Sequence, residues 1–254
     1  MLTGNNLAGN VMYGIELGVL YRGERELCFL PLAHAYSCAF NFLVPMAVGA
    51  HVYLLGKVPS PKILLKAFEE VKPNLILTVP LILEKIYKKM ILPQLSKTTM
   101  KVALNIPLLD SRIYAQIRKK LVDAFGGRFR EVIVGGAAMN EEVTNFLYKI
   151  KFPFTIGYGM TECGPLISYD HNDEYVPGSC GQILKGIMKV RIDSEDPYNK
   201  VGEIQVSGEN VMKGYYKNEE ATSKFLRRTA GCVRVTWGRS TPITVFISVA
   251  VARR

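Results

Sequence analysis

The sequence lacks the cysteine spacings that would indicate a metal or redox site. Its five cysteines (Cys28, Cys38, Cys163, Cys180 and Cys232) include no C-x-x-C pair, so neither a zinc centre nor a dithiol motif is indicated. An odd number of cysteines in a chain of 254 residues also argues against a disulfide framework. We therefore expect a reducing, cytoplasmic location.

The sequence also lacks a long uninterrupted apolar segment. The longest one, residues 39–55, is broken by Asn41, Pro45 and His51, whereas a membrane span needs about 20 consecutive apolar residues. We expect a buried helix that leads into a buried strand. No signal peptide followed by a small-residue cleavage site is recognisable.

Acidic residues are absent from the last part of the chain. The formal net charge is +10, and residues 226–254 contain six arginines and no Asp or Glu. The remaining charge of +4 is spread along the chain. Because the basic balance comes mostly from this terminal segment, we expect no nucleic-acid partner.

Strand-like and helix-like segments alternate through the first two thirds of the chain. The expected strands are residues 27–32, 51–55, 73–80, 131–136 and 152–159, and the expected helices are residues 62–71, 81–95, 111–125 and 140–150. Gly126 and Gly127 should end the third helix, and Asn140 should cap the fourth. This alternation predicts an α/β fold with parallel sheet(s) flanked by helices.

The pattern changes from Gly178 onward. Short strand-like segments, residues 178–184, 188–193 and 202–208, follow one another with glycine or polar breaks and no helix between them. They predict a small antiparallel β-barrel-like subdomain after the α/β part.

A polar cluster stands at the end of the last expected parallel strand, in the stretch "TIGYGMTECGP". Ligands of such sheets bind at the carboxyl ends of strands. The Tyr158 ring can stack on a flat base. The Thr161 hydroxyl can contact a phosphate oxygen, and the Glu162 carboxylate suits Mg²⁺. The cluster thus describes a magnesium–nucleotide site, and the alternative is a tight turn whose polar side chains face water.

The two glycine-rich phosphate motifs of other nucleotide enzymes are missing. The segment "GYGMTECG" has the wrong third-glycine spacing for a dinucleotide fingerprint, and Pro165 follows it where a helix should begin. No Walker P-loop occurs in the chain.

The stretch "GYGMTE" at residues 157–162 resembles the signature of the acyl-adenylate-forming superfamily, which includes acyl-CoA synthetases, luciferases and adenylation domains. Four more segments resemble that family in the same order: "MLTGNNL" at 1–7, "FLPLAHAYS" at 29–37, "VGGAAMNEEV" at 134–143 and "GEIQVSGENVMKGYYKNEEAT" at 202–222. The resemblance covers roughly residues 1–225, and bacterial long-chain fatty acid–CoA ligases are the nearest subgroup.

The resemblance implies an AMP-forming ligase that uses ATP, Mg²⁺ and coenzyme A. Such an enzyme joins a carboxylic acid to AMP with release of pyrophosphate, and then moves the acyl group to the thiol of coenzyme A. In this chain Tyr158 would stack on adenine, with Gly159 and Met160 beside it. Thr161 would contact phosphate and act in catalysis, and Glu162 would hold the metal and also act in catalysis.

The same resemblance implies roles for two further segments. Gly135, Gly136 and Ala137 would form the wall between adenine and the acyl chain, although a plain strand–helix turn would also explain the two glycines. His34 would lie over the reacting carboxylate as a catalytic residue, although a lone histidine is more often structural. His51 and His171 have no motif context, and we take both as structural.

The segment "AHAYSCAFNF" at residues 33–42 limits which class of carboxylic acid could be the substrate. It offers no carboxylate to pair with a substrate ammonium, and a buried unpaired charge is costly. A long chain would bury many methylenes at about 0.8 kcal/mol each. We therefore favour a fatty acid and consider peripheral contact with the inner membrane face. An aryl or short acid, and a non-catalytic acyl- or adenylate-binding remnant, are the alternatives.

The resemblance also implies elements that this sequence does not carry. The family has a Ser/Thr/Gly-rich phosphate loop before the segment that matches "MLT". After residue 225 it has a Thr-Gly-Asp, a hinge and a small domain with a catalytic lysine. Read in a shifted frame, the codons of residues 229–238 permit Asp-Gly-Trp-Leu-Arg-Thr-Gly-Asp-Leu-Gly. We hypothesise that a base was lost near the Phe225–Leu226 codons, which sequencing the gene would decide.

These observations divide the chain into four parts. Residues 1–60 would be part of a first α/β subdomain, and residues 61–176 a second that carries the adenylate motif. Residues 177–225 would begin a β subdomain, and residues 226–254 would be the frameshifted tail. We expect this polypeptide alone not to turn over.

Overall fold

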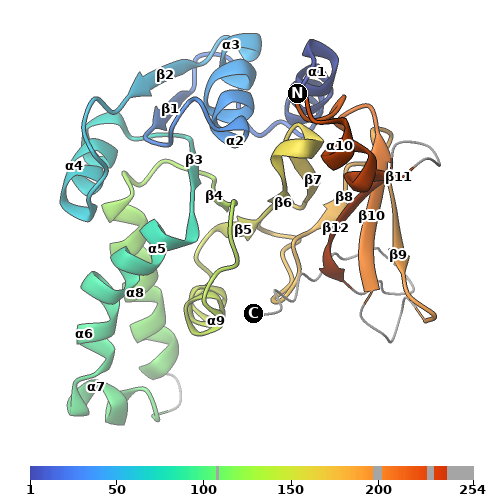
Figure 1. Ribbon diagram of the computed structural model, residues 1–254. Coiled ribbons are helices and arrows are strands. Elements are labelled where there is room, and N and C mark those ends of the chain that lie inside the picture. The colour runs from blue at the N-terminus through green and yellow to red at the C-terminus, as the bar shows by residue number, and fades with distance from the viewer. Residues whose placement is uncertain (107–108, 197–201, 228–231, 239–254) are drawn as a thin grey trace.

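The computed structural model describes residues 1–106, 109–196, 202–227 and 232–238, and a five-stranded sheet forms its centre (Figure 1). The strand order is β2-β1-β3-β4-β5. The strands are β1 (Arg25–Cys28), β2 (His51–Leu54), β3 (Leu75–Thr78), β4 (Glu131–Val134) and β5 (Phe154–Ile156). Every neighbouring pair is parallel, which confirms the predicted α/β class.

The central strands are buried on both faces, as the nearly continuous apolar runs indicated. On β3, Leu75 and Leu77 pack into one hydrophobic cluster, whereas Ile76 packs into another. On β4, Ile133 belongs to the first cluster and Val132 to the second. Because side chains alternate along a strand, the two clusters are the two faces of one sheet.

Four helices cover one of these faces (Figure 1). They are α4 (Pro61–Val71), α5 (Pro80–Ile86), α8 (Leu109–Ala124) and α9 (Glu141–Lys149). The α9 cap is confirmed, because the Asn140 side chain accepts a hydrogen bond from the backbone N–H of Val143 at 3.2 Å. Gly126 and Gly127 follow the end of α8 with φ of 91° and 71°, a left-handed conformation that suits glycine.

The other face meets a second set of elements. It packs against the N-terminal helix α1 (Gly4–Glu16), the short helices α2 (Ala35–Ser37) and α3 (Val44–Val48), and the π-helix η1 (Cys38–Leu43) between them. Strands of the antiparallel sheets complete this cluster. The parallel sheet is therefore packed between two different layers, one on each of its faces.

The segment predicted as one helix over residues 81–95 is divided in the structure. Helix α5 gives way to the π-helix η2 (Tyr87–Ile91), and α6 (Leu92–Leu95) and α7 (Thr98–Ala103) follow. Pro93 explains the division, because proline donates no backbone hydrogen bond and its ring displaces the carbonyl four residues earlier. The other π-helix, η1, likewise ends two residues before a proline, Pro45.

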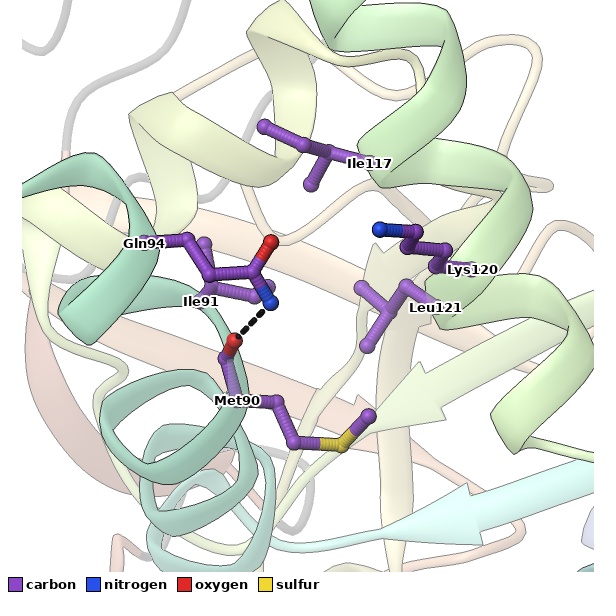
Figure 2. Close-up of a pocket in the computed structure, with 6 residues that line it drawn as sticks. All are labelled: Met90, Ile91, Gln94, Ile117, Lys120 and Leu121. Atoms are coloured by element: carbon purple, nitrogen blue, oxygen red, sulfur yellow. Dashed lines mark hydrogen bonds between the residues drawn. The ribbon is translucent and has the colours of Figure 1, made fainter. Parts of the chain in front are cut away.

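A small cavity of about 20 Å³ lies between η2–α6 and α8 (Figure 2). Its lining is mostly apolar, and Gln94 turns its amide back to the Met90 carbonyl at 2.7 Å. This volume is about that of one water molecule, so the cavity is a packing gap and not a binding site.

The expectation of a buried strand near residue 52 is wrong. Strand β2 lies at the edge of the sheet, and its Leu54 side chain is 66% exposed. An apolar run predicts burial only where a second layer covers it, and within the described residues β2 pairs with β1 alone. Residues 39–55 otherwise form short helices and this strand, and no helix among the described residues is long and apolar enough to span a membrane.

The strands after residue 157 form two antiparallel sheets. One contains β6 (Tyr158–Gly159), β7 (Leu166–Tyr169) and β8 (Gln182–Ile183), and the other contains β9 (Met188–Asp193), β10 (Gly202–Gly208), β11 (Leu226–Arg227) and β12 (Cys232–Gly238). Segment 178–184 was expected to join the later strands, but its strand β8 pairs with β7. The cause is β7, a fully buried strand that the sequence analysis did not identify.

The segment predicted to be frameshifted is described only in part. Strands β11 and β12 fall within it, and β12 pairs antiparallel with β10. A short helix, α10 (Glu219–Phe225), precedes them. The frameshift, which concerns the codons and not the strands, stays a prediction, as do the domain boundaries.

Candidate functional site

The loop from Gly157 to Leu166 begins at the carboxyl end of β5. The Gly157 N–H donates to the Val134 carbonyl at 3.0 Å, which continues the pairing with β4 beyond the strand. The chain then forms β6, the 3-10 turn η3 (Thr161–Cys163) and β7. This is the sheet edge where the polar cluster was expected.

Gly159 allows the loop to close tightly. A Cβ at this position would lie 2.2 Å from the Pro165 carbonyl oxygen, which is far closer than two such atoms can approach. The Met160 N–H donates to that same carbonyl at 2.8 Å. A glycine is therefore needed here by the backbone, and the turn directs Thr161 and Glu162 away from the sheet's interior.

One cavity of about 320 Å³, here called the His34 cavity, lies at this loop. Eight of the nine predicted site residues line it: His34, Gly135, Gly136, Tyr158, Gly159, Met160, Thr161 and Glu162. They come from positions as far apart in sequence as residues 34 and 162, and the fold brings them together. Thr161 is exposed and Glu162 is half-buried, so these two polar side chains face both the cavity and the solvent.

A second cavity of about 460 Å³, here called the Ala137 cavity, adjoins the first. It contains the ninth predicted residue, Ala137, and it is also lined by Tyr175 and Ser179. Four residues line both cavities: Gly136, Gly157, Tyr158 and Gly159. Three glycines and one tyrosine thus form a thin wall between two compartments.

His34 caps helix α2 and its imidazole is exposed at the rim of the His34 cavity. Its Nδ1 accepts a hydrogen bond from the backbone N–H of Tyr36 at 3.2 Å. A neutral His34 therefore carries its proton on Nε2. Local geometry fixes the tautomer and leaves Nε2–H as the donor.

Tyr36 supports the floor of the His34 cavity. Its hydroxyl donates to the Ile133 carbonyl at 3.2 Å, and its ring would lie 3.3 Å from a Cβ at Gly135. Burial, together with the carboxylates of Glu26 and Glu131, raises the pKa of Tyr36 well above its usual value. The phenol is therefore neutral and structural.

Glu162 is held by a segment that lies about 50 residues later in the sequence. Its Oε1 accepts a hydrogen bond from the Tyr215 hydroxyl at 2.8 Å, and its backbone carbonyl accepts one from the Met212 N–H at 2.7 Å. Burial first, and then the Glu162 carboxylate, raises the pKa of Tyr215 to about 12. Tyr215 thus stays protonated at neutral pH and fixes the direction of the carboxylate.

Two asparagines of α1 hold the loop from its other side. Asn10 accepts from the Leu166 N–H at 2.9 Å and donates to the Cys163 carbonyl at 3.4 Å. Asn6 donates to the Val211 carbonyl at 2.9 Å and also to that of Glu209. Both side chains are buried, so α1 fastens the η3 turn and the segment that carries Tyr215 to one support.

Sequence reasoning missed Tyr215, Asn6 and Asn10. Asn6 and Asn10 are four residues apart on one helix and therefore share one face, and two amides on an otherwise apolar face were the available signal. Tyr215 lies within the segment 202–222 that resembles the family, but nothing local marks its partner Glu162, which is 53 residues away.

Comparison with known proteins agrees with this geometry. A family model described as "AMP-binding enzyme" matches residues 1–216. The chain belongs to the AMP-binding enzyme family. The family match runs from α1 to the segment that carries Tyr215, so it includes every residue of the site described above.

Relatives of this chain include ligases for different acids. Long-chain-fatty-acid–CoA ligase 1 of Saccharomyces cerevisiae is 27% identical over 80% of this chain and 32% of its own length. 4-Coumarate-CoA ligase 1 of Narcissus pseudonarcissus is 29% identical over 88% of this chain and 38% of its own. The chain therefore spans about a third of the length of these curated relatives.

Solved structures share the fold at lower identity. An o-succinylbenzoate CoA synthetase from Bacillus subtilis, bound to a product analogue, matches with a TM-score of 0.74 at 20% identity, over 100% of this chain and 46% of its own. Apo MatB from Rhodopseudomonas palustris gives the same TM-score and identity over 98% of this chain and 44% of its own. At this identity the likeness establishes a shared fold and nothing further.

Proposed function

We propose that this chain is part of an AMP-forming ligase that activates a long-chain fatty acid. The acid's carboxylate oxygen would attack the α-phosphorus of ATP, forming acyl-AMP and releasing pyrophosphate. The thiolate of coenzyme A would then attack the acyl carbon, forming the thioester and releasing AMP. Both steps balance without an oxidant or reductant.

The observation that carries this proposal is the pair of cavities that share one wall. An acyl-adenylate has a flat base and an apolar chain joined at a phosphate. The base would occupy the Ala137 cavity with the Tyr158 ring against it, and the acyl phosphate would lie in the His34 cavity. The shared glycines let both parts approach the backbone closely.

The polar groups of the His34 cavity suit the reacting centre. Thr161 offers a hydroxyl to a phosphate oxygen, and the Nε2–H of His34 can donate to the carboxylate that reacts. This donor would stabilise negative charge on the acyl oxygen as the carbonyl is attacked. We assign these two residues and Glu162 to catalysis on that basis.

The donor set at Glu162 suits Mg²⁺ only when a nucleotide is bound. Among the described residues no group of three or more His, Cys, Asp or Glu side chains could hold a metal ion. Mg²⁺ commonly takes one or two carboxylates and completes its shell with phosphate oxygens and waters. Glu162 would therefore hold the ion together with ATP, and the ion would neutralise phosphate charge.

The acyl class is the finer part of the proposal. The His34 cavity is lined by Ile133, Met160 and Leu166 in addition to its polar residues, and an apolar wall suits an alkyl chain. A 4-coumarate or other aryl acid is the second candidate, since 4-coumarate ligases are as similar in sequence as the fatty-acid ligases. Both classes lack the ammonium group that would need a buried carboxylate.

Calorimetry with a non-hydrolysable palmitoyl-AMP mimic, an acyl sulfamate of adenosine, tests the proposal on the chain as it exists. We expect saturable binding that is lost in Tyr158→Ala and kept in Tyr53→Ala, a matched change on the exposed strand β2. No binding, or equal binding by the two variants, would contradict the proposed site. Competition with the coumaroyl mimic separates the two acid classes, because the tighter ligand identifies the class.

We further propose that this polypeptide is cytoplasmic and that, by itself, it binds the acyl-adenylate without turnover. The relatives are about three times as long, and an assay for pyrophosphate release with ATP and palmitate tests this point directly. Measurable release that disappears in Glu162→Ala would show that the chain is catalytic by itself.

A further inference from the structure

The helices farthest from the antiparallel sheets form an exposed tip (Figure 1). It consists of residues 88–106 and 109–112, which include α6, α7 and the start of α8, and it is called the helical tip below. The family site lies elsewhere, at the ends of β4 and β5. None of the contacts described for that site involves the helical tip.

The charge around the helical tip has one sign. Residues 85–109 contain five lysines and no aspartate or glutamate. Residues 85–112 therefore have a net charge of +5, because one arginine and one aspartate are added. The charge that remains outside the arginine-rich tail is thus concentrated here, and the expectation that it is spread along the chain is wrong.

These lysines are available to a partner. Lys88, Lys89 and Lys97 are exposed, and among the described residues no carboxylate forms an ion pair with any of them. The acidic residues that flank this segment make other contacts: the Glu84 carboxylate accepts the backbone N–H of Asn140 at 2.9 Å, and the Asp110 carboxylate accepts that of Ser111 at 2.6 Å.

Aliphatic side chains are exposed among these lysines. Leu92 is 37% exposed, Val102 59%, Ile106 48% and Leu109 38%. Single exposed aliphatic residues are common, but the helical tip exposes four of them together with three lysines that form no ion pair among the described residues, so its surface carries both apolar and cationic groups. Such a surface contains both parts of an interfacial membrane anchor.

We propose that the helical tip docks on an anionic lipid bilayer. The aliphatic side chains would enter the boundary between headgroups and acyl chains, and the lysine ammonium groups would stay at the level of the lipid phosphates. A nucleic acid offers phosphates but no apolar phase for Val102 and Ile106. A bilayer surface offers both, which is why charge and exposure together favour it.

The inference does not depend on the acid that the site activates. Vesicle binding and nucleotide binding are separate measurements, so either proposal can fail while the other stands. A ligase docked in this way would draw an apolar acid directly from the bilayer, which is where such an acid dissolves.

Flotation with phosphatidylcholine vesicles, with and without phosphatidylserine, tests the proposal on the full chain. We expect binding that needs phosphatidylserine and that weakens at high salt. The double variant Lys88→Glu with Lys89→Glu should lower the partition coefficient by at least about 20-fold, since each lysine contributes roughly fivefold. The matched double variant Lys57→Glu with Lys62→Glu, exposed but outside the tip, should bind like the wild type.

The contribution of the exposed aliphatic side chains of the helical tip is tested separately. Val102→Glu with Ile106→Glu should reduce vesicle binding by about tenfold or more, whereas Val58→Glu, 84% exposed between β2 and α4, should not. All variants keep the six arginines of residues 226–254, so any binding by that segment is common to them. Circular dichroism melting checks that each variant folds.

Three outcomes would overturn the proposal. The first is an absence of binding to phosphatidylserine vesicles, and the second is equal binding by the tip variants and their matched controls. The third is a tip variant that changes self-association in sedimentation equilibrium while vesicle binding stays the same. That result would identify the surface as a contact between protein copies.

Discussion

The Tyr215 hydroxyl donates a hydrogen bond of 2.8 Å to Oε1 of Glu162, although the two residues are 53 positions apart in the sequence. The carboxylate proposed to hold Mg²⁺ is therefore oriented by a residue that does not itself offer a ligand. Outer partners of metal ligands commonly set ligand orientation and affinity.

The first prediction follows from this hydrogen bond. Tyr215→Phe removes the donor and keeps the ring, so the Glu162 carboxylate loses its fixed direction. We expect the affinity for ATP in the presence of Mg²⁺ to fall about tenfold or more, and the affinity without Mg²⁺ to stay nearly the same. Calorimetry with ATP in the presence and in the absence of Mg²⁺ measures the two affinities.

The neighbouring Tyr216 provides a control, because it is 70% exposed. Tyr216→Phe should change neither affinity. Equal losses with and without Mg²⁺ in Tyr215→Phe would show that the tyrosine supports the loop and not the metal site.

The second prediction concerns the tight closure at Gly159. In Gly159→Ala the new Cβ would meet the Pro165 carbonyl oxygen at 2.2 Å, and a backbone atom cannot move aside cheaply. We expect a loss of about 1–3 kcal/mol in the free energy of unfolding, together with weaker binding of the palmitoyl-AMP mimic. Urea unfolding and calorimetry measure the two effects.

Gly56→Ala is the matched change, since nothing lies within 4 Å of the added Cβ. It should leave stability within about 0.5 kcal/mol of the wild type. If Gly159→Ala is equally harmless, the loop has room for a Cβ at residue 159 and its closure does not require glycine.

The third prediction concerns Asn10. Its replacement by alanine leaves the buried Leu166 N–H without its acceptor, and an unsatisfied buried donor costs about 1–3 kcal/mol. We expect that loss in urea unfolding, with weaker nucleotide binding because the η3 turn loses its support. Asn5→Ala, on the exposed side of the same helix, should be neutral, and equal effects of the two changes would rule out the supporting role.

Much of the parallel layer could be predicted because its signals are local. The run of residues 73–80 lies between prolines and predicted β3, and the spacing of residues 62–71 predicted α4. Gly126 with Gly127 predicted the end of α8. Each of these features depends on residues close together in the sequence.

The site could be predicted only as a set of positions, and its supports could not. The motifs marked His34, Gly135 and Tyr158 as candidate positions, and in the structure these three residues line one cavity. The bonds of Asn10 to Leu166 and of Tyr215 to Glu162 cross more than 50 positions, and no periodicity marks such pairs. The exposure of β2 was missed because hydrophobicity alone does not reveal whether a strand is covered.

The last prediction concerns the buried carboxylate of Glu131. Its Oε1 accepts from the Tyr169 hydroxyl at 2.6 Å and lies 3.2 Å from Nδ1 of His171. Burial alone would raise the pKa of Glu131, but the hydrogen bonds from His171 and Tyr169 outweigh it and hold this pKa below 4.5. The hydrogen bond to Glu131 raises the pKa of His171 above 6.5, against the opposing effect of burial.

The two shifts define a pH window. The stabilisation from His171 is fully present below pH 6.5 and is lost as pH rises through its higher folded pKa. The stabilisation from Glu131 is present above pH 4.5 and is lost as pH falls through its lower folded pKa. The pair of Glu131 and His171 therefore stabilises the fold most between pH 4.5 and pH 6.5.

His171→Asn should make the free energy of unfolding depend less steeply on pH above pH 6.5. Urea unfolding below pH 6.5 and well above it should show that the wild type loses more stability than the variant does. His51→Asn, at an exposed histidine, should keep the slope of the wild type, because His51 has no carboxylate partner among the described residues. Since all other titrating groups are common to the three proteins, the difference in slope reports the pair, and equal slopes would mean that His171 is not charged in the folded state.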